Sequence, residues 1–240
     1  MLGGPAHGAR ECLPRMVRRY ARLLWAVSLL ALVLVPSIGR DTAHPYESAQ
    51  PVTEPRLFGE GIFSTRFDEF GLAFTRDGNT AFFNRGVPHS NLYVIMTSSF
   101  RSGRWTEPEV APFSGQFWDF DCVFSPDGSR AFFGSDRPVP GHPKDDQDFD
   151  IWMVEKTSKG WSEPRHLDEA VNSGEDETFA SAAANGTLYF VSGRDGGRQH
   201  LAIYRSRFVD GKYQPAEKLK GPVNDAENWS LEVPALADVA

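Results

Sequence analysis

The stretch that decides the fold is "GLAFTRDGNTAFF" at 71–83, because it returns as "DCVFSPDGSRAFF" at 121–133. A shortened copy, "ASAAANGTLYF", follows at 180–190. Each copy holds an apolar segment, an Asp-Gly or Asn-Gly turn and a second apolar segment, which is the pattern of a β-hairpin. A repeat of roughly 50 residues that contains several short strands is typical of a β-propeller blade.

A second shared block follows each hairpin and predicts two more strands. The blocks are "NLYVIMTSSFRSGRWTEPEV", "DIWMVEKTSKGWSEPRHL" and "LAIYRSRFVDGKYQPAEKL". In each, an apolar strand is followed by a turn and an outer fourth strand. Pro164 suits that outer position, since an edge strand tolerates a missing N–H. The sequence therefore predicts four-stranded antiparallel blades at about 66–113, 114–171 and 172–224, with a partial blade at 225–240.

The shared pattern F-(S/T)-x-D-G-x-x-x-F-F, then (D/N)-(I/L)-(W/Y), then G-x-W-(S/T)-E-P resembles the TolB-like, WD-repeat-like propeller repeats of bacteria. The resemblance covers about 56–236, nearly all of the chain after its N-terminal segment. It implies an all-β propeller with four-stranded blades around a central channel, usually six of them in the family. It also implies a periplasmic or secreted protein that binds partners more often than it catalyses.

The number of blades departs from that family pattern. We count three full blades, a leading strand at 56–65 and a trailing strand at 229–236. Because a propeller needs about four blades to close, we expect a truncated six-bladed propeller. The alternative is a reduced fourth blade that is built from the leading and trailing strands. An open propeller would expose apolar faces and strand edges, which favours association.

The N-terminal segment carries the features of an export signal. Four arginines between positions 15 and 22 precede the apolar run "LLWAVSLLALVLV" at 23–35, and small Ser37 and Gly39 follow. A basic region, a short apolar region and a small-residue site predict a signal peptide at 1–39. An uncleaved membrane anchor is the alternative. Residues 40–55 would then be a linker, and the protein would be periplasmic or secreted.

The charge of the chain limits its partners. The net charge is −7, and removal of residues 1–39 with their five arginines and one glutamate makes it −11. Such an acidic domain is a poor candidate for nucleic acid or an anionic membrane, but it is compatible with cationic ligands, divalent metals or neutral polymers. Beyond the signal or anchor we expect no integral membrane domain. Cys122, the one cysteine after the signal, is expected to be a buried thiol.

Each blade repeats an acid at the start of its innermost strand and an arginine after its second strand. These candidate ligand-binding residues are Glu69, Asp119, Glu177, Arg85, Arg137 and Arg194. Two hypotheses explain them. The arginines pair with the acids and hold the loops, or both types surround the channel mouth and bind a polar ligand or a charged tail. Repetition in every blade favours pairing, because a binding site is usually asymmetric.

No motif points to a cofactor or a catalytic residue. The run "KDDQDFD" at 144–150 has carboxylates that Ca²⁺ prefers but lacks the glycine and distal glutamate of an EF-hand loop, which favours a solvated insertion. The favoured function is therefore an exported, non-enzymatic propeller that binds a protein or a cell-envelope polymer through its channel mouth. The alternative is a glycosidase-type or lactonase-type hydrolase that uses Glu69, Asp119 and Glu177.

Overall fold

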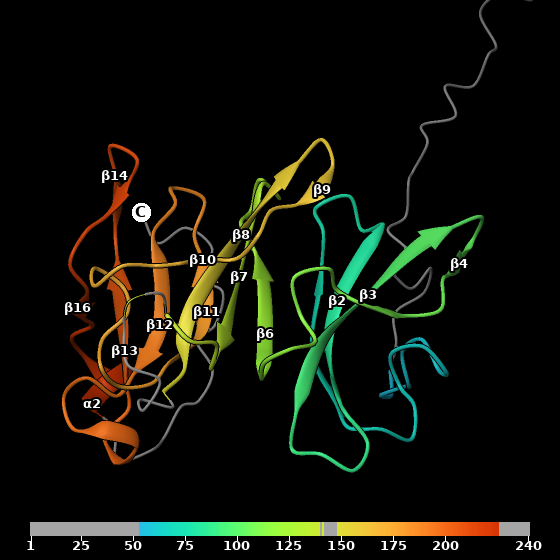
Figure 1. The fold of residues 1–240 in the computed structure, drawn as a ribbon, viewed down its shortest axis with the longest axis horizontal. Helices are drawn as coiled ribbons and strands as arrows, with labels where there is room; N and C mark the ends of the chain where they lie inside the picture. Colours follow the sequence, from blue (N-terminus) through green and yellow to red (C-terminus); the bar gives the residue numbers. More distant parts are fainter. Residues whose placement is uncertain (1–52, 140, 142–147, 226–240) are drawn as a thin grey trace, which may run out of the picture. The chain divides into compact units, whose positions relative to one another are not determined.

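The computed structural model describes residues 53–139, 141 and 148–225 of the chain (Figure 1). These residues form antiparallel sheets joined by turns, so the prediction of an all-β fold is confirmed. The predicted signal peptide, most of the linker and the predicted trailing strand at 229–236 lie outside the described residues. Within them, no helix is long and apolar enough to cross a membrane.

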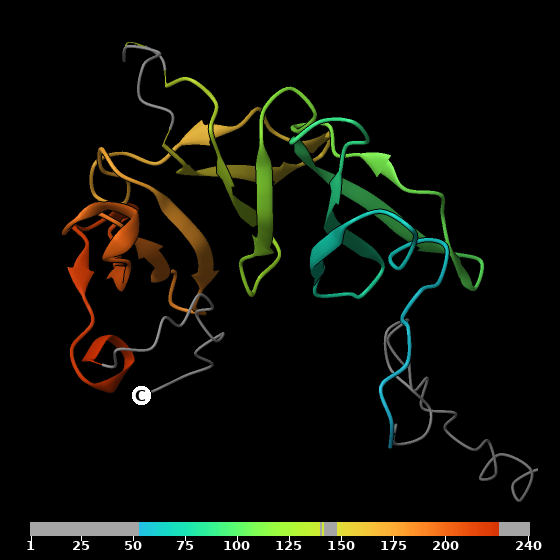
Figure 2. The ribbon, with the colours of Figure 1, turned by 90° about the horizontal axis from the view of Figure 1, so that it is seen from below.

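Three sheets follow one another along the chain, one in each repeat, and Figure 2 shows them in successive colours. Sheet 1 consists of β1 (Glu69–Phe74), β2 (Thr80–Gly86), β3 (Tyr93–Arg101), β4 (Arg104–Trp105) and β5 (Glu109–Val110). Sheet 2 consists of β6 (Asp119–Phe124), β7 (Arg130–Ser135), β8 (Asp150–Thr157), β9 (Gly160–Trp161) and β10 (Arg165–His166). Sheet 3 consists of β11 (Glu177–Ala182), β12 (Leu188–Ser192), β13 (Ala202–Ser206) and β16 (Glu217–Lys218).

A short hairpin and two single turns complete the third repeat. The strands β14 (Phe208–Val209) and β15 (Lys212–Tyr213) form a separate two-stranded hairpin after β13. A 3-10 turn, η1 (Gly197–Gln199), follows β12, and a single helical turn, α2 (Pro222–Asp225), closes the repeat. Each repeat thus places its first three strands in the order of the sequence; both outer pieces pair with the third strand in repeats 1 and 2, whereas only β16 does so in repeat 3.

The outer strand differs from its prediction, because two short pieces replace one continuous strand. In sheet 2 both pieces pair with β8: Trp161 lies opposite Lys156, and His166 lies opposite Trp152. Pro164 lies between the pieces. Because proline lacks the N–H that a ladder requires, the pairing is interrupted there and resumes at Arg165. The same split separates β4 from β5 and β15 from β16.

The predicted leading strand at 56–65 is wrong, since this segment forms turns with one isolated bridge between Glu60 and Ser64. Gly59 and Gly61 have φ angles of 54° and 83°, values that end an extended strand. The carbonyl of Gly59 accepts hydrogen bonds from the N–H groups of Ile62 and Phe63 at 2.9 and 2.8 Å. The apolar side chains of the segment instead pack against sheet 1.

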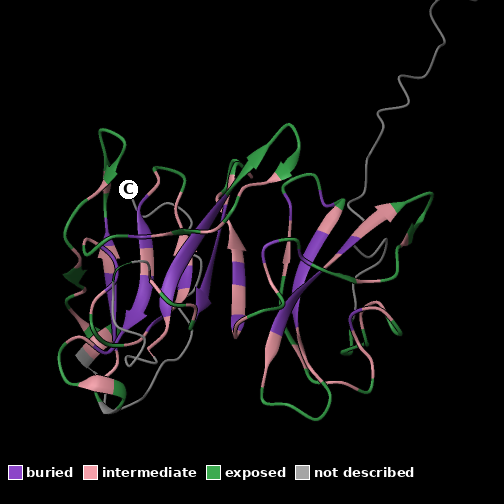
Figure 3. Ribbon diagram, viewed as in Figure 1, coloured by how far each residue is buried: buried purple, intermediate pink, exposed green. Residues whose placement is uncertain are grey.

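The core lies between consecutive sheets, as the buried strands in Figure 3 show. Successive side chains of a strand point to opposite faces, so Phe133 packs with Phe82 of sheet 1 while Phe132 packs with Phe190 of sheet 3. Cys122 is buried in the first of these interfaces, as predicted. Burial raises the pKa of its thiol, which keeps the sulfur protonated and unreactive.

Candidate functional site

The predicted acids and arginines meet inside each repeat. Hydrogen-bonded ion pairs join Arg85 to Glu69 at 2.9 Å and Arg137 to Asp119 at 2.6 Å, and Arg194 lies 3.4 Å from Glu177. The register of each inner hairpin explains this proximity: Glu69 lies directly opposite Arg85, while Asp119 and Glu177 lie opposite Ser135 and Ser192. In the second and third repeats, the arginine follows that serine by two residues.

Each pair also holds the segment that enters its sheet. The arginines donate to the backbone carbonyls of Ile62, Phe113 and Val171. The acids accept hydrogen bonds from the hydroxyls of Thr65, Ser114 and Ser173 in the same segments. We call these three arrangements the clasps, defined by the pairs Glu69–Arg85, Asp119–Arg137 and Glu177–Arg194. The clasps fasten each connecting segment to the sheet that follows it.

The acids of the clasps are enclosed. The side chains of Asp119 and Glu177 have no exposed surface, and that of Glu69 has 7%. Burial raises the pKa of Glu177, while hydrogen bonds from Ser192 and Ser173 and the charge of Arg194 oppose that rise. A ligand would therefore meet the arginines of the clasps before it met the acids. Ligand binding by these six residues stays a prediction.

A cleft of about 1180 Å³ lies beside sheet 2, and two of the clasp arginines, Arg137 and Arg194, line it. We call it the acidic cleft. The aromatic side chains Phe117 and Trp118 also line it. Its described carboxylates are Asp136, Asp148, Asp150, Asp168 and Glu169, and its third basic group is His166. Since Asp119 and Glu177 already neutralise the two arginines, the cleft presents net negative charge.

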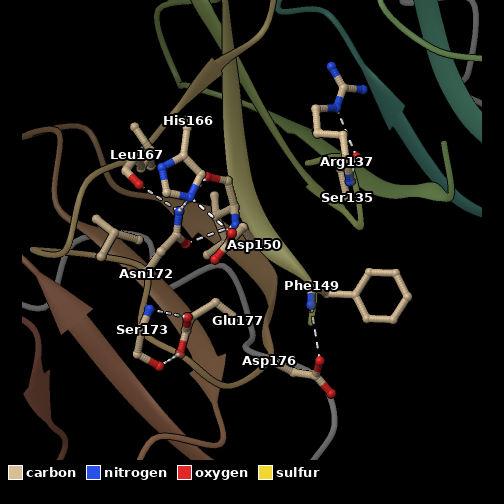
Figure 4. Close-up of polar contacts among 12 residues, drawn as sticks. Ser135, Arg137, Phe149, Asp150, His166, Leu167, Asn172, Ser173, Asp176 and Glu177 are labelled. Atoms are coloured by element: carbon tan, nitrogen blue, oxygen red, sulfur yellow. Dashed lines mark hydrogen bonds and ion pairs between the residues drawn. The ribbon is translucent and has the colours of Figure 1, made fainter. Parts of the chain in front are cut away.

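One of these carboxylates is buried. Asp150, the first residue of β8, has 6% of its surface exposed, and its Oδ2 lies 3.0 Å from Nε2 of His166 on β10 (Figure 4). Asn172 also lies 3.0 Å from that ring nitrogen, but its two N–H groups point to the carbonyls of Ile151 and Leu167. Nε2 of His166 is thereby assigned as the donor to Asp150.

The other oxygen of Asp150 lacks a donor. Oδ1 is enclosed and has no hydrogen-bond partner in the described part of the chain. Arg137 does not supply one, because its guanidinium is bound to Asp119, Ser135 and the carbonyl of Phe113. A buried acceptor without a donor is costly and rare in a stable fold, so this carboxylate marks a point of the cleft that the fold itself does not satisfy.

Asp150 also departs from the repeat. The next residue in each third strand, Ile95, Ile151 or Ile203, donates its N–H to a side-chain oxygen of the following connecting segment. This shared contact aligns Asp150 with Val94 and Ala202. Two of the three repeats thus carry a small apolar side chain where repeat 2 carries a buried acid.

His166 departs from the repeat in the same way. It lies opposite Trp152, whereas the residues opposite the equivalent Met96 and Tyr204 are Val110 and Lys218. The contacting pair therefore exists in one repeat of the three. This asymmetry is what a binding site in a repeated scaffold requires.

Sequence reasoning did not single out this pair. The shared pattern (D/N)-(I/L)-(W/Y) aligned Asp150 with Asn91 of the first repeat, and His166 fell in the predicted outer strand without a role of its own. The strand register instead aligns Asp150 with Val94, so the acid in an apolar position becomes visible only when the folded repeats are compared. Residues 144–147 of that insertion lie outside the described residues. Among those the structure describes, no group of three His, Cys, Asp or Glu side chains is arranged to hold a metal ion.

No family model and no curated protein matches the sequence. Solved structures similar to it include TolB from Acinetobacter baumannii, with 21% identity, a TM-score of 0.44 and coverage of 63% of this chain and 33% of TolB. Hydrazine synthase from Kuenenia stuttgartiensis has 21% identity and a TM-score of 0.37, and the match covers 57% of this chain and 39% of the synthase chain.

A structure from a study of two prolyl endopeptidases has 16% identity and a TM-score of 0.43, and covers 65% of this chain and 22% of that protein. The chain therefore spans well under half the length of each of these three structures. Because all three TM-scores are below 0.5, these similarities say nothing about the site. The architecture of the chain follows from its own sheets.

Proposed function

We propose that this chain is an exported β-propeller protein that binds a basic, extended segment of a partner protein in its acidic cleft. Three successive antiparallel sheets of five, five and four strands support the propeller, since small antiparallel sheets that follow one another along the chain are the units from which propellers are built. Export remains an inference from the N-terminal signal in the sequence. The observation that carries the binding role is the cleft itself, where carboxylates outnumber free cations beside two aromatic rings.

The chemistry of the lining favours a cationic ligand. Asp136, Asp168 and Glu169 are exposed and can attract lysine or arginine side chains from solution. Trp118 is half-buried, and its ring lies 5.5 Å from that of Phe149 and 5.8 Å from that of Tyr93. Such a supported ring provides a rigid face for the aliphatic stem of a basic side chain or for its cation.

Binding is supported better than hydrolysis by the geometry of the inner acids. Glu69, Asp119 and Glu177 are the carboxylates that a propeller hydrolase would use, yet each is held by hydroxyl groups and an arginine. A general acid or base must reach the proton that it transfers. Asp119 and Glu177 have no exposed surface from which to do so.

The test is fluorescence anisotropy with the full chain and three labelled probes: a lysine–serine peptide, a matched glutamate–serine peptide and a soluble fragment of cell-wall glycan. We expect the lysine peptide to bind and the other two not to bind. Trp118→Ala, which removes the aromatic face, should weaken this binding by about tenfold or more. Glu163→Gln, on an exposed acid outside the cleft, is the matched control and should change affinity little.

Two results would reject this function. Equal affinity of the Trp118→Ala and Glu163→Gln variants for the lysine peptide would show that charge alone attracts the peptide to the surface. Binding of the glycan fragment in place of the lysine peptide would assign the cleft to a cell-envelope polymer instead.

A further inference from the structure

We infer that Asp150 and His166 form a subsite for the primary ammonium group of a lysine side chain. This inference rests on the proposed function, because it names which part of a basic segment the cleft recognises. Four observations support it. Asp150 breaks the repeat, its Oδ1 lacks a hydrogen-bond donor, and its Oδ2 is already bound by His166. The side chains around the pair are mostly acidic.

The fold does not require an acid at this position. Val94 and Ala202 fill the equivalent places of repeats 1 and 3, where they are buried. Transfer of a carboxylate from water into such a place is unfavourable unless it is fully paired. The presence of Asp150 therefore destabilises the repeat relative to valine, and a cost of this kind is typical of a functional position.

His166 provides a hydrogen-bond donor to only one of the two carboxylate oxygens of Asp150. The imidazole donates to Oδ2 at 3.0 Å, and its own side chain is 23% exposed at the cleft. Its ring is fixed by an edge contact with Trp152 at 5.0 Å. Oδ1 keeps an unmet need for a donor. The terminal torsion of aspartate is soft, so a small rotation that keeps Oδ2 within reach of His166 can move Oδ1 toward the cleft that Asp150 lines.

The single available oxygen selects between the two basic side chains. A guanidinium binds best when two parallel N–H groups meet both oxygens of a carboxylate. His166 already occupies one of them, so that geometry is blocked. An ammonium is a compact point charge that can donate to one oxygen. The subsite should therefore prefer lysine to arginine.

The surroundings keep the subsite attractive to a cation. Asp136, Asp148, Asp168 and Glu169 line the same cleft. Arg137, one arginine of this cleft, lies over the ring of Trp152 at 5.2 Å and is neutralised by Asp119. Arg194, the other arginine of the cleft, lies 3.4 Å from Glu177, so both guanidiniums face acids of their own clasps rather than Asp150.

A cycle of protein and peptide variants tests the inference. The probes are short serine–glycine peptides, capped at both ends, that carry one lysine, one acetyl-lysine or one arginine. With the full chain we expect the lysine peptide to bind about 10- to 100-fold more tightly than the acetyl-lysine peptide, the range of a hydrogen bond to a buried charge. The arginine peptide should bind more weakly than the lysine peptide.

Two variants separate the subsite from the rest of the cleft. Asp150→Asn should remove the preference for lysine over both other peptides. Asp168→Asn, which removes an exposed charge from the same cleft, should weaken the lysine and arginine peptides to a similar degree and leave the preference for lysine in place. Because a folding defect in Asp150→Asn would also abolish the preference for lysine, the double variant Asp150→Val with His166→Val provides a second test. It restores the residues of repeat 1, Val94 and Val110.

The outcomes are distinct. If Asp150→Asn, or the folded double variant, retains the wild-type preference for lysine, the subsite inference is wrong, although the proposed function stands. If the arginine peptide binds wild type as tightly as the lysine peptide does, the argument from the single oxygen is wrong. If none of the basic peptides binds the wild-type chain, the proposed function and the inference both fail.

Discussion

Replacement of Asp119 by alanine should weaken the attachment of sheet 1 to sheet 2 and lower the free energy of unfolding. The carboxylate of Asp119 accepts hydrogen bonds from Ser114 at 2.7 Å, Ser135 at 2.6 Å and Arg137 at 2.6 Å. The Oγ of Ser114 in turn accepts the N–H of Ile95 in β3 at 3.0 Å. Arg137 also donates to the carbonyl of Phe113, at the end of the segment that connects the two sheets. The hydrogen bonds of Asp119 therefore link sheet 2 to the connecting segment and, through Ser114, to sheet 1.

The magnitude follows from burial. The Asp119 side chain has no exposed surface, and that of Arg137 has 9%. Removal of one partner from a buried pair costs about 3–5 kcal/mol, because it leaves an uncompensated charge. Against a total stability of about 5–15 kcal/mol for a domain, this is a large fraction. Asp119→Asn keeps the shape and some hydrogen bonds, so it should cost less, roughly 1–3 kcal/mol.

Urea unfolding monitored by tryptophan fluorescence measures this loss. With a slope near 2 kcal/mol per molar urea, Asp119→Ala should lower the midpoint by about 2 M. Glu217→Gln is the matched control: Glu217 is half-exposed and pairs with Arg205 at 3.1 Å. Because such surface pairs contribute about 0–1 kcal/mol, the control should lie close to wild type.

A double variant separates the lost pair from other effects. Asp119→Leu combined with Arg137→Met removes both charges, and apolar replacements of a buried pair are often close to neutral. We expect the double variant to be more stable than Asp119→Ala. If Asp119→Ala proves no less stable than Glu217→Gln, the clasps do not hold the sheets together and the reasoning is refuted.

Two further predictions concern a clasp and a turn. Burial raises the pKa of Glu177 in the folded chain, so the free energy of unfolding falls as the pH rises through that raised pKa. The urea midpoint of the wild type, compared with that of Glu177→Gln, should therefore increase as the pH is lowered from neutral. A difference between the two midpoints that does not change with pH would contradict this. Gly128 has a φ of 71° in its hairpin turn, so Gly128→Ala should cost about 1 kcal/mol in thermal unfolding. Gly174→Ala is the control, since a Cβ there meets no atom within 4 Å and the backbone is not left-handed; equal effects of the two changes would refute the turn argument.

The sequence predicted best what depends on neighbouring residues. The hairpin turns formed at the predicted glycines, with the N–H of Gly78, Gly128 and Gly186 donating to the carbonyl three residues before at 2.7, 2.8 and 2.9 Å. The proximity of acids and arginines was also predictable, because the inner strands repeat with the same register. The sequence could not decide whether these acids pair with the arginines or bind a ligand, because that depends on how deeply each carboxylate is buried.

Other features depend on contacts between distant segments. The segment at 56–65 has the apolar residues of a strand, but two glycines with positive φ fold it into turns against sheet 1. The contact between Asp150 and His166 arises because β10 pairs with β8 in one register. Neither residue has a local pattern that indicates the other, and only comparison of the folded repeats shows that both positions are exceptional.

The most direct test of the account is to locate a bound basic peptide on the chain. Carbodiimide coupling joins an amine to a carboxylate that it contacts, and mass spectrometry of the digested product identifies the carboxylate. We predict that the lysine–serine peptide couples to the acids of the cleft: Asp136, Asp148, Asp168 and Glu169. Coupling to exposed acids elsewhere, such as Glu107, Glu155 and Glu163, at equal or greater yield would contradict the assignment of the acidic cleft as the binding site.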